Sequence, residues 1–334
     1  MKSRQPIVIE VMRGSVVEST HQVMAVIADD RGLVHGYHGN VDYLTYPRSC
    51  IKLLQALPLV ESGALEKFGL DDKMLALACS SHTGEKQHLL VVHQWMERLQ
   101  AKESWLHCGP AWPAHEATQH EMIRKNLQPS PLLNNCSGKH LGFIAACLAH
   151  GENPQGYEKW EHPLQVRLRK VLSETMRVNH ERLPWGVDGC GIPTYAVPLQ
   201  AIAIGMASLL SPGTETRKVS ARRILDACRK HPTLLAGSDE FVSIVNEKTG
   251  GRVILKSGAE GVYSALIPEK GMAFAVKVAD GHWRAAEVAC AHLLRSLGGI
   301  TEQLFFELKE HSMPAVMNSR GEKVGEIRLQ KGTT

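Results

Sequence analysis

Ser49 and Lys52 are a pair of residues whose types and spacing suit nucleophilic catalysis. They lie three residues apart near the start of an expected helix, residues 48–61, and residues with this spacing share one helix face. A serine hydroxyl becomes a good nucleophile when a neighbouring base takes its proton, and a lysine serves as that base when burial or a nearby cation lowers its pKa. The pair therefore predicts a Ser-Lys nucleophile, and the alternative is a capped helix with a solvated lysine.

A second serine and a second lysine lie in segments that suit the same site. Lys256 begins a Lys-Ser-Gly sequence in an expected strand, and Ser-x-x-Lys enzymes of the penicillin-binding and β-lactamase group line the site opposite the nucleophile with such a strand. Ser81 lies between a strand-like apolar run, residues 74–78, and a helix, in the sequence Cys-Ser-Ser-His-Thr-Gly-Glu of residues 79–85. We therefore predict that Ser81 pairs with Lys256 near the first pair. A surface strand and a simple helix cap are the alternatives for these two segments.

The cysteines are expected to be free thiols, and the sequence does not decide whether any of them bind a metal. Eight cysteines are spread over the chain, and in a long chain without a secretion signal we expect them to be unpaired. The sequence contains neither Cys-x-x-Cys nor His-Glu-x-x-His, so residue spacing alone does not reveal a zinc site. Cys136 precedes a helix rich in small residues, and Cys190 lies in a glycine-rich loop. From the residues alone, Cys136 and Cys190 are either metal ligands or small buried hydrophobic groups.

The expected secondary structure places these residues between two groups of strands. Segments rich in β-branched residues predict strands near both ends of the chain, at 7–11, 16–27, 33–37, 252–256, 261–267 and 272–278. Candidate helices fill the middle, at 48–61, 85–99, 138–149, 163–177, 198–210 and 216–230. We predict an α/β (α+β) fold in which N- and C-terminal strands form one sheet and a helical lobe is inserted between them. The prediction is a single two-lobed domain, 1–334, with a sheet lobe at about 1–45 and 250–334 and a helical lobe at about 46–249.

Composition and charge narrow the class of protein. The 334 residues are 43% hydrophobic, which is enough to form a large core. The formal net charge of +4 is spread along the chain without a basic cluster, so we expect no nucleic-acid partner. The sequence contains no run of about 18 apolar residues, so it predicts no membrane span. Since the N-terminal residues also lack a signal-peptide pattern, we expect a cytoplasmic protein.

Together these segments resemble the rhizobial-type L-asparaginase family, also called the asparaginase II family, over nearly the whole chain. The resemblance rests on seven segments that occur in one order: Arg13-Gly14 with Val17-Glu18-Ser19 and His21, Pro47-Arg48-Ser49 with Lys52, Ser81-His82, Asn135-Cys136-Ser137-Gly138-Lys139-His140, His162-Pro163-Leu164-Gln165, Asp188-Gly189-Cys190, and Lys256-Ser257-Gly258-Ala259-Glu260-Gly261. It implies a fold like that of the serine β-lactamases and penicillin-binding proteins, a homodimer, and hydrolysis of a small molecule, L-asparagine, to L-aspartate and ammonia.

The resemblance also implies roles for the candidate residues. Two Ser-Lys pairs meet in one site, and these are Ser49 with Lys52 and Ser81 with Lys256. A zinc ion lies beside the substrate pocket without being the hydrolytic centre, and its ligands here would be Cys136, Lys139 and Cys190. In the expected mechanism Lys52 takes the proton of Ser49, which attacks the side-chain amide. The sequence leaves open whether Ser49 or Ser81 forms the covalent bond.

An amino-acid substrate requires binding groups of both charges. We expect Arg48 to bind the α-carboxylate and Asp188 the α-ammonium, with His82 as a further substrate contact, although Arg48 could equally pair with a structural carboxylate. Three other functions stay open, namely a zinc-dependent hydrolase, a β-lactamase-like amidase or β-lactam-binding protein that acts on another amide such as peptidoglycan, and an amino-acid sensor without catalysis. The sequence does not decide between asparagine and glutamine, because one methylene changes binding by only about 1–3 kcal/mol.

Overall fold

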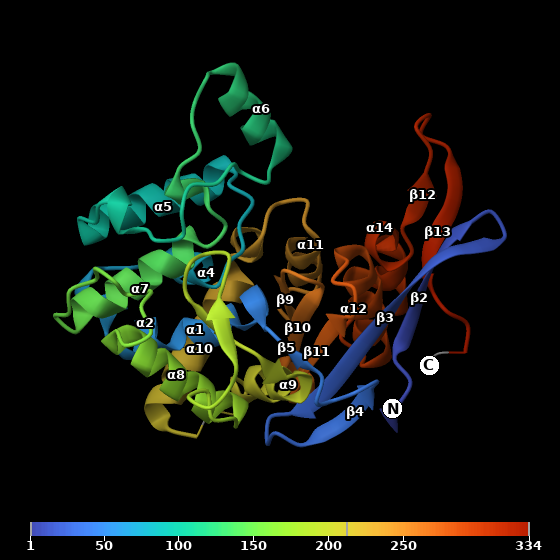
Figure 1. Cartoon of the computed structure of the whole chain (residues 1–334), viewed down its shortest axis with the longest axis horizontal. Coiled ribbons are helices and arrows are strands. Elements are labelled where there is room, and N and C mark those ends of the chain that lie inside the picture. Colours follow the sequence, from blue (N-terminus) through green and yellow to red (C-terminus); the bar gives the residue numbers. More distant parts are fainter. Residues whose placement is uncertain (1, 212, 333–334) are drawn as a thin grey trace.

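A nine-stranded sheet combines strands from the two ends of the chain. The computed structural model describes residues 2–211 and 213–332. The sheet has the order β12-β13-β2-β3-β11-β10-β9, with β4 beside β3 and β1 beside β4. These strands are β1 (Lys2–Ser3), β2 (Ile7–Arg13), β3 (Val16–Asp29), β4 (Val34–His38), β9 (Ile254–Gly258), β10 (Val262–Ile267), β11 (Met272–Val278), β12 (Ala315–Met317) and β13 (Lys323–Leu329). Figure 1 shows the blue N-terminal strands side by side with the orange and red C-terminal strands.

The centre of the sheet is the antiparallel pair β3 and β11. Their register runs from Met272 opposite Asp29 to Val278 opposite Val23. Residues 23–28 are all buried although successive side chains point to opposite faces, so both faces of this part of the sheet are covered. The helices α9 (Leu199–Ser208) and α12 (Trp283–Ser296) both pack against β3 and β11. The continuous apolar sequence of β3 therefore reflects burial on two sides.

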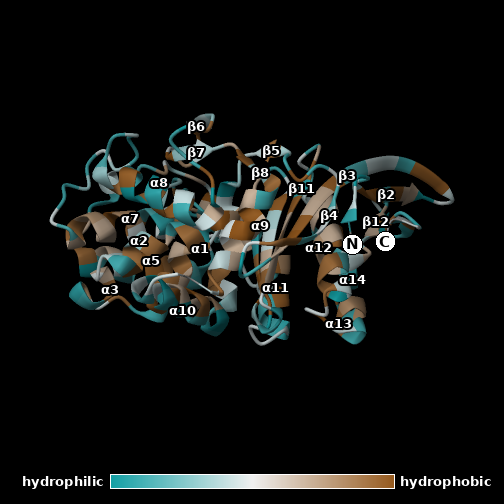
Figure 2. Cartoon of the chain, turned by 90° about the horizontal axis from the view of Figure 1, so that it is seen from below, coloured by the Kyte–Doolittle hydropathy of each residue, from teal (hydrophilic) through white to brown (hydrophobic). Residues whose placement is uncertain are grey.

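Helices form the other part of the molecule, on the left of Figure 1. They are α1 (Lys52–Gln55), α2 (Leu57–Glu61), α3 (Ala64–Lys67), α4 (Asp72–Ala78), α5 (Lys86–Leu99), α6 (Glu116–Arg124), α7 (Ser137–Ala149), α8 (Pro163–Met176) and α10 (Glu215–Lys230), with α11 (Phe241–Lys248), α13 (Glu302–Glu307) and α14 (Lys309–Ser312) nearer the sheet. α4 contacts α5, α7 and α10, so it lies at the centre of this lobe. In Figure 2, α9 is largely hydrophobic, whereas many of the outer turns are hydrophilic.

Short elements complete the chain. Five 3₁₀ helices are described, η1 (Arg48–Ile51), η2 (Glu103–Trp105), η3 (Pro131–Leu133), η4 (Pro232–Leu235) and η5 (Pro268–Lys270). Two ribbons of two strands lie outside the main sheet, β5 (Leu44–Thr45) with β8 (Val197–Pro198) and β6 (Trp185–Val187) with β7 (Pro193–Tyr195). None of the helices within the described ranges has the length and apolar character needed to cross a membrane.

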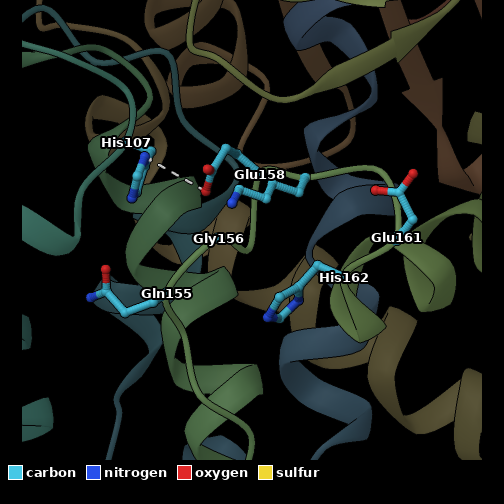
Figure 3. Close-up of a pocket in the computed structure, with 7 residues that line it drawn as sticks. His107, Gln155, Gly156, Glu158, Glu161 and His162 are labelled. Atoms are coloured by element: carbon cyan, nitrogen blue, oxygen red, sulfur yellow. Dashed lines mark ion pairs between the residues drawn. The ribbon is translucent and has the colours of Figure 1, made fainter.

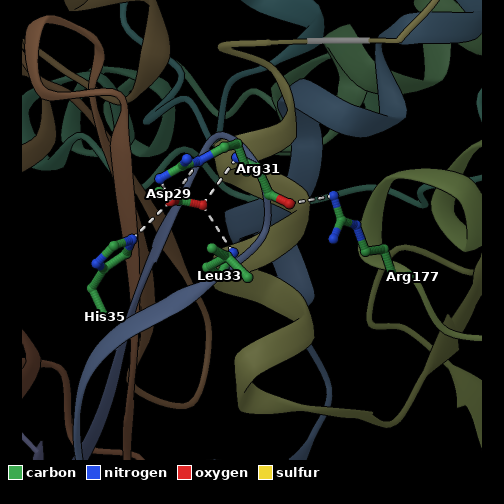
Figure 4. A network of polar contacts seen from close by, with 5 residues as sticks. All are labelled: Asp29, Arg31, Leu33, His35 and Arg177. Carbon is green, nitrogen blue, oxygen red and sulfur yellow. Dashed lines mark hydrogen bonds and ion pairs between the residues drawn. The ribbon is translucent and has the colours of Figure 1, made fainter.

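The turn after β3 joins the sheet to the helical lobe, and Figure 4 shows its contacts. Asp29 accepts hydrogen bonds from the backbone nitrogen of Leu33 at 2.9 Å and lies 2.7 Å from His35 Nε2. Although burial opposes it, these hydrogen bonds and those from Arg31 hold the pKa of Asp29 well below its ordinary value. The carbonyl of Arg31 accepts from Arg177, at the end of α8, at 2.6 Å. A turn expected from the sequence therefore also contacts the end of α8.

The predicted architecture is confirmed, with local differences. Strands from both ends form one sheet and most helices come from the middle of the chain, as expected. The expected helix 48–61 is instead divided into η1, α1 and α2. Pro58, in the first turn of α2, has no N–H to continue the hydrogen bonding of α1, which accounts for the break between these two helices. The division into lobes at residues 45 and 250 stays a prediction. Helix α9 lies within the range assigned to the helical lobe but packs on the sheet.

Candidate active site

Three segments far apart in the sequence bring the two serines and two lysines together. Ser49 and Lys52 come from η1 and the start of α1, Ser81 follows α4, and Lys256 lies in β9. The segment before Ser81 was expected to be strand-like but is the helix α4, which is buried among other helices. Strand β9 packs directly on η1. A Cβ at Gly258 would lie 3.1 Å from the backbone nitrogen of Cys50, so glycine is the residue that allows this close approach.

The hydroxyl of Ser81 lies between the two lysine side chains. Lys256 Nζ is 2.9 Å from Ser81 Oγ, and Lys52 Nζ is 3.2 Å from the same oxygen. Both lysines are almost completely buried, whereas Ser81 is half-buried. Each lysine also donates to backbone carbonyls, Lys52 to those of Ser80 and Asn135 and Lys256 to that of Ser257. One partly accessible hydroxyl is thus held by two buried amines.

Lys256 has the charge properties of a base. Burial lowers the pKa of Lys256 to about 7, and the nearby charge of Lys52 acts in the same direction. A lysine with this pKa is largely neutral slightly above neutral pH and then accepts a proton through its lone pair. Because Ser81 Oγ is within hydrogen-bond distance, Lys256 is placed to take the Ser81 proton.

Ser49 lies one turn before Lys52, whose backbone nitrogen donates to the Ser49 carbonyl, but the Ser49 hydroxyl makes no hydrogen bond with the amine of Lys52. The Ser49 hydroxyl is half-buried and has no hydrogen-bond partner within residues 2–211 and 213–332, while Lys52 donates to Ser81. Proton transfer from Ser49 to Lys52 therefore stays a prediction. Arg48, directly before Ser49, has a φ of 52°. This left-handed conformation is rare outside glycine and often occurs at functional sites.

Arg48 and Asp188 are bound to each other. Arg48 Nε donates to Asp188 Oδ1 at 2.8 Å, and the backbone nitrogen of Gly189 donates to the same oxygen at 2.7 Å. Asp188 begins the loop between β6 and β7, so the ion pair joins this loop to the turn of Ser49. The structure brings both predicted substrate-binding residues to the site, but the charge of each is satisfied by the other. Their contact with a substrate stays a prediction.

Cys136, Lys139 and Cys190 form a second buried cluster. Lys139 Nζ is 2.8 Å from Cys190 Sγ. Interaction with the Cys190 thiol holds the pKa of Cys136 well below its ordinary value, and the same interaction raises the pKa of Cys190. Burial acts to lower the pKa of Lys139, but the negative charge of the cysteines outweighs it and raises this pKa. These directions favour a thiolate at Cys136 beside a charged Lys139.

The donor atoms of this cluster fit a zinc ion if the lysine is included. In the described part of the chain, no group of three or more His, Cys, Asp or Glu side chains is arranged to hold a metal ion. Sulfur and nitrogen are the ligands that Zn²⁺ prefers, and two sulfurs and one amine meet here. The amine must lose its proton to bind a metal, so metal binding would release protons. Occupancy by zinc stays a prediction.

His82 is buried beside the site. It is 1% exposed, its Nε2 lies 2.8 Å from Ser137 Oγ, and its ring stacks on His88 with centroids 5.2 Å apart. Its Nδ1 has no hydrogen-bond partner among the described residues. Burial and the charge of neighbouring groups hold the pKa of His82 well below its ordinary value, so the ring is neutral. A direct contact between His82 and a substrate stays a prediction.

Sequence reasoning missed the groups that hold these side chains in place. The carbonyl of Asn135 binds Lys52, and the side chain of Asn134 donates to the carbonyl of Cys108 at 2.8 Å and accepts from the nitrogen of Cys136 at 2.9 Å. Asparagine side chains commonly bind nearby backbone groups in turns. The adjacent pair Asn134-Asn135 directly before Cys136 was therefore the available signal.

A cavity of about 530 Å³ lies away from the two serines, and Figure 3 shows it. Its lining residues are His107, Gln155, Gly156, Glu158, Lys159, Glu161 and His162. His107 Nδ1 lies 3.6 Å from Glu158 Oε2, and His162 accepts from the backbone nitrogen of Leu164 as the cap of α8. None of the predicted catalytic residues lines this cavity, so we do not assign the reaction to it.

Comparisons with known proteins were made for the whole chain. A family model described as L-asparaginase II matches residues 9–329. No curated protein matches the chain. Similar solved structures include a β-lactamase from Mycobacterium bovis, which is 13% identical, with 83% of this chain and 95% of that chain covered and a TM-score of 0.41. Another is a simvastatin synthase mutant from Aspergillus terreus, which is 12% identical, with 76% and 86% covered and a TM-score of 0.31.

Proposed function

Because this chain belongs to the L-asparaginase II family, a family of asparaginase-type amidohydrolases, we propose that it is an L-asparaginase that hydrolyses L-asparagine to L-aspartate and ammonia by Ser/Lys catalysis. The observation that carries the proposal is the hydroxyl of Ser81 between two buried lysines, Lys52 and Lys256. Amide hydrolysis through an acyl-enzyme needs a nucleophile with an adjacent base, and this arrangement supplies both.

The hydrogen bonds support different roles for Lys52 and Lys256. Carbonyl oxygens only accept hydrogen bonds, so Lys52 uses two N–H groups for the carbonyls of Ser80 and Asn135. Lys256 uses one N–H for the carbonyl of Ser257, and its lone pair is then free to accept from Ser81. In the proposed mechanism, Lys52 stays a donor that orients Ser81, and Lys256 is the base.

The reaction then proceeds through an ester of the enzyme. Ser81 Oγ attacks the side-chain amide carbon of asparagine while its proton moves to Lys256. The carbon–nitrogen bond breaks as Lys256 returns that proton to the leaving ammonia, and water hydrolyses the aspartyl ester with Lys256 again as base. Ser49 is the alternative nucleophile, because catalytic hydrogen bonds often form only when substrate is bound.

Charged groups beside the serines supply the proposed amino-acid selectivity. The α-carboxylate of asparagine would replace Asp188 on Arg48, and the α-ammonium would bind the carboxylate of Asp188. Both side chains are partly exposed, at 25% for Arg48 and 12% for Asp188, so a substrate reaches them from solvent. His82 would act from behind Ser137, as a neutral hydrogen-bonding group.

Zinc, a homodimer and a cytoplasmic location belong to the same proposal. Cys136, Lys139 and Cys190 would hold Zn²⁺, which would add positive charge beside the substrate and fix the loop of Asp188. The eight cysteines are free thiols, which supports a reducing compartment. The homodimer rests on the family resemblance alone and is tested by light scattering of the purified protein.

An ammonia-release assay with asparagine and glutamine tests the function. We expect turnover of asparagine, loss of about 10³-fold or more in Ser81→Ala, and an aspartyl adduct on Ser81 in intact-protein mass spectra of quenched reactions. An adduct on Ser49 would assign the nucleophile to Ser49. Activity that survives complete metal removal at saturating asparagine would favour serine chemistry over a zinc hydrolase. Labelling by a penicillin would favour a β-lactam-binding protein, and asparagine binding without ammonia release would favour a sensor.

A further inference from the structure

Lys277 is a buried lysine that the proposed mechanism does not use. It lies in β11 and is 8% exposed. Its Nζ donates to the carbonyl of Glu260 at 2.7 Å and to the carbonyl of Val278. Burying an ammonium is unfavourable unless its N–H groups donate hydrogen bonds. The two carbonyl partners of Lys277 therefore stabilise its burial, and the lysine in turn holds these carbonyls in place.

The carbonyl of Glu260 belongs to the turn between β9 and β10. Gly258 pairs with Val262, so residues 259–261 form the turn. Glu260 and Gly261 both have left-handed backbones, with φ of 61° and 63°. This conformation is strained for a glutamate and persists only when neighbouring groups hold it. Strand β11 supplies those groups, because Lys277 binds the carbonyl of Glu260 and the nitrogen of Val278 donates to that of Gly261 at 3.0 Å.

This turn directly follows the part of β9 that contributes to the site. Lys256 lies two residues before Gly258, whose backbone is packed against Pro47 and Cys50. On the next strand, Ser264 Oγ donates to the carbonyl of Cys50 at 2.8 Å. Movement of the turn would therefore change the position of Lys256 relative to Ser81 and the packing of the strand on η1.

We propose that Lys277 is a positioning residue that holds the β9–β10 turn and thereby keeps Lys256 within hydrogen-bond distance of Ser81. The proposal rests on the proposed function, since its kinetic consequence requires Lys256 to be the base. Lys277 itself touches no reacting group. It acts through the backbone carbonyl of Glu260, from the strand β11 that pairs with β10.

The test is Lys277→Met, which keeps the length of the side chain and removes its hydrogen bonds. We expect kcat for asparagine to fall about 10- to 100-fold, since small misplacements of a catalytic group have effects of this size, with a smaller change in KM. The midpoint of the rise of kcat with pH should also shift. The titratable groups around Lys256, namely Lys52, Cys50, Cys79 and Cys136, are unchanged in the variant, so this shift reports the position of Lys256.

Lys67→Met is the matched control. Lys67 also donates to two backbone carbonyls, those of Leu148 at 3.1 Å and Ala149 at 3.2 Å, but at the far end of α7. The kcat of Lys67→Met should stay within about twofold of the wild-type value, as for most surface substitutions, and its pH profile should match that of wild type. Lys277→Arg should recover part of the lost activity, because a guanidinium still donates to carbonyls.

Amide hydrogen exchange separates this proposal from the proposed function. Exchange at residues 256–264 should be faster in Lys277→Met than in wild type, and this readout needs no substrate. Unchanged exchange together with an unchanged pH profile in the folded variant would overturn the positioning role. If Lys277→Met does not fold, Lys277→Gln, which keeps an N–H donor, is measured in the same way with the same two outcomes. A wild-type protein that hydrolyses no amide would refute the proposed function, while hydrogen exchange would still decide the role of Lys277.

Discussion

The molecule contains two buried lysines whose pKa values are shifted in opposite directions. Lys256 and Lys139 are 0% and 3% exposed, and each has a side-chain partner at less than 3 Å, Ser81 Oγ or Cys190 Sγ. Beside Ser81 the neighbouring charge is another lysine, so burial and repulsion together lower the pKa of Lys256. Beside the cysteines a thiolate outweighs burial and raises the pKa of Lys139. Burial alone therefore does not make a base, and the charge of the nearest neighbour decides the role.

The largest effect that tests this comparison is on turnover. Lys256→Met should lower kcat about 10²- to 10⁴-fold, the range for loss of a general base, while the fold is retained. Lys139→Met should lower kcat much less, because its ammonium is not placed to accept the Ser81 proton. Ammonia release gives both values, and circular dichroism checks folding. Equal losses in the two variants would argue against Lys256 as the base.

The same two substitutions should have different effects on the free energy of unfolding. In protein freed of metal, Lys139→Met leaves the Cys136 thiolate buried without its cation, which typically costs about 3–5 kcal/mol of unfolding free energy. Lys256→Met removes a buried amine that is repelled by Lys52, so its stability at pH 7 should equal or exceed that of wild type. Urea denaturation measures both. Adding Cys136→Ser to Lys139→Met should restore stability, and a failure to do so would contradict the thiolate assignment.

A smaller effect is expected in the pH dependence. Because activity needs neutral Lys256, kcat/KM, which reports the free enzyme, should rise with pH through about 7 and level off above it, and kcat should also rise with pH. The free energy of unfolding changes with pH in the same direction, because the lysine in the unfolded chain keeps its proton up to a pKa of about 10.4. The unfolded state therefore binds more protons between about pH 7 and 10, and this group makes stability increase with pH in that window. A kcat profile that is flat from pH 6 to 9 would show that Lys256 does not control the reaction.

Much of the fold was predictable because its strongest signals are local. The long β-branched stretch of β3 and the turn at Asp29 depend on residues close in sequence. The ribbons β5–β8 and β6–β7 were missed, since strands of two or three residues have no detectable alternation. The division of the expected helix at Pro58 was readable from the sequence, because proline lacks an N–H.

The sequence predicted which serines and lysines lie together, but only some of their contacts. Spacing placed Ser49 near Lys52, and the Lys-Ser-Gly sequence together with the family resemblance paired Ser81 with Lys256, which are 175 residues apart. That Lys52 donates to Ser81 instead of Ser49 depends on where α4 ends relative to η1, which is a tertiary contact. The pairing of Arg48 with Asp188 and the charge of Lys139 also arise only in the folded chain.

The sheet formed from both ends of the chain has a consequence for biosynthesis. Strand β3 pairs with β11, and β2 pairs with β13, so these contacts join residues about 250 to 320 positions apart. Contacts this distant in sequence slow folding and cannot form on the ribosome until the last strands have emerged. Lys256 likewise reaches Ser81 only after the 175 positions between them have been synthesised. The nascent chain must keep β2 and β3 from aggregating during that time, and a chaperone that binds exposed strands would raise the yield of active enzyme.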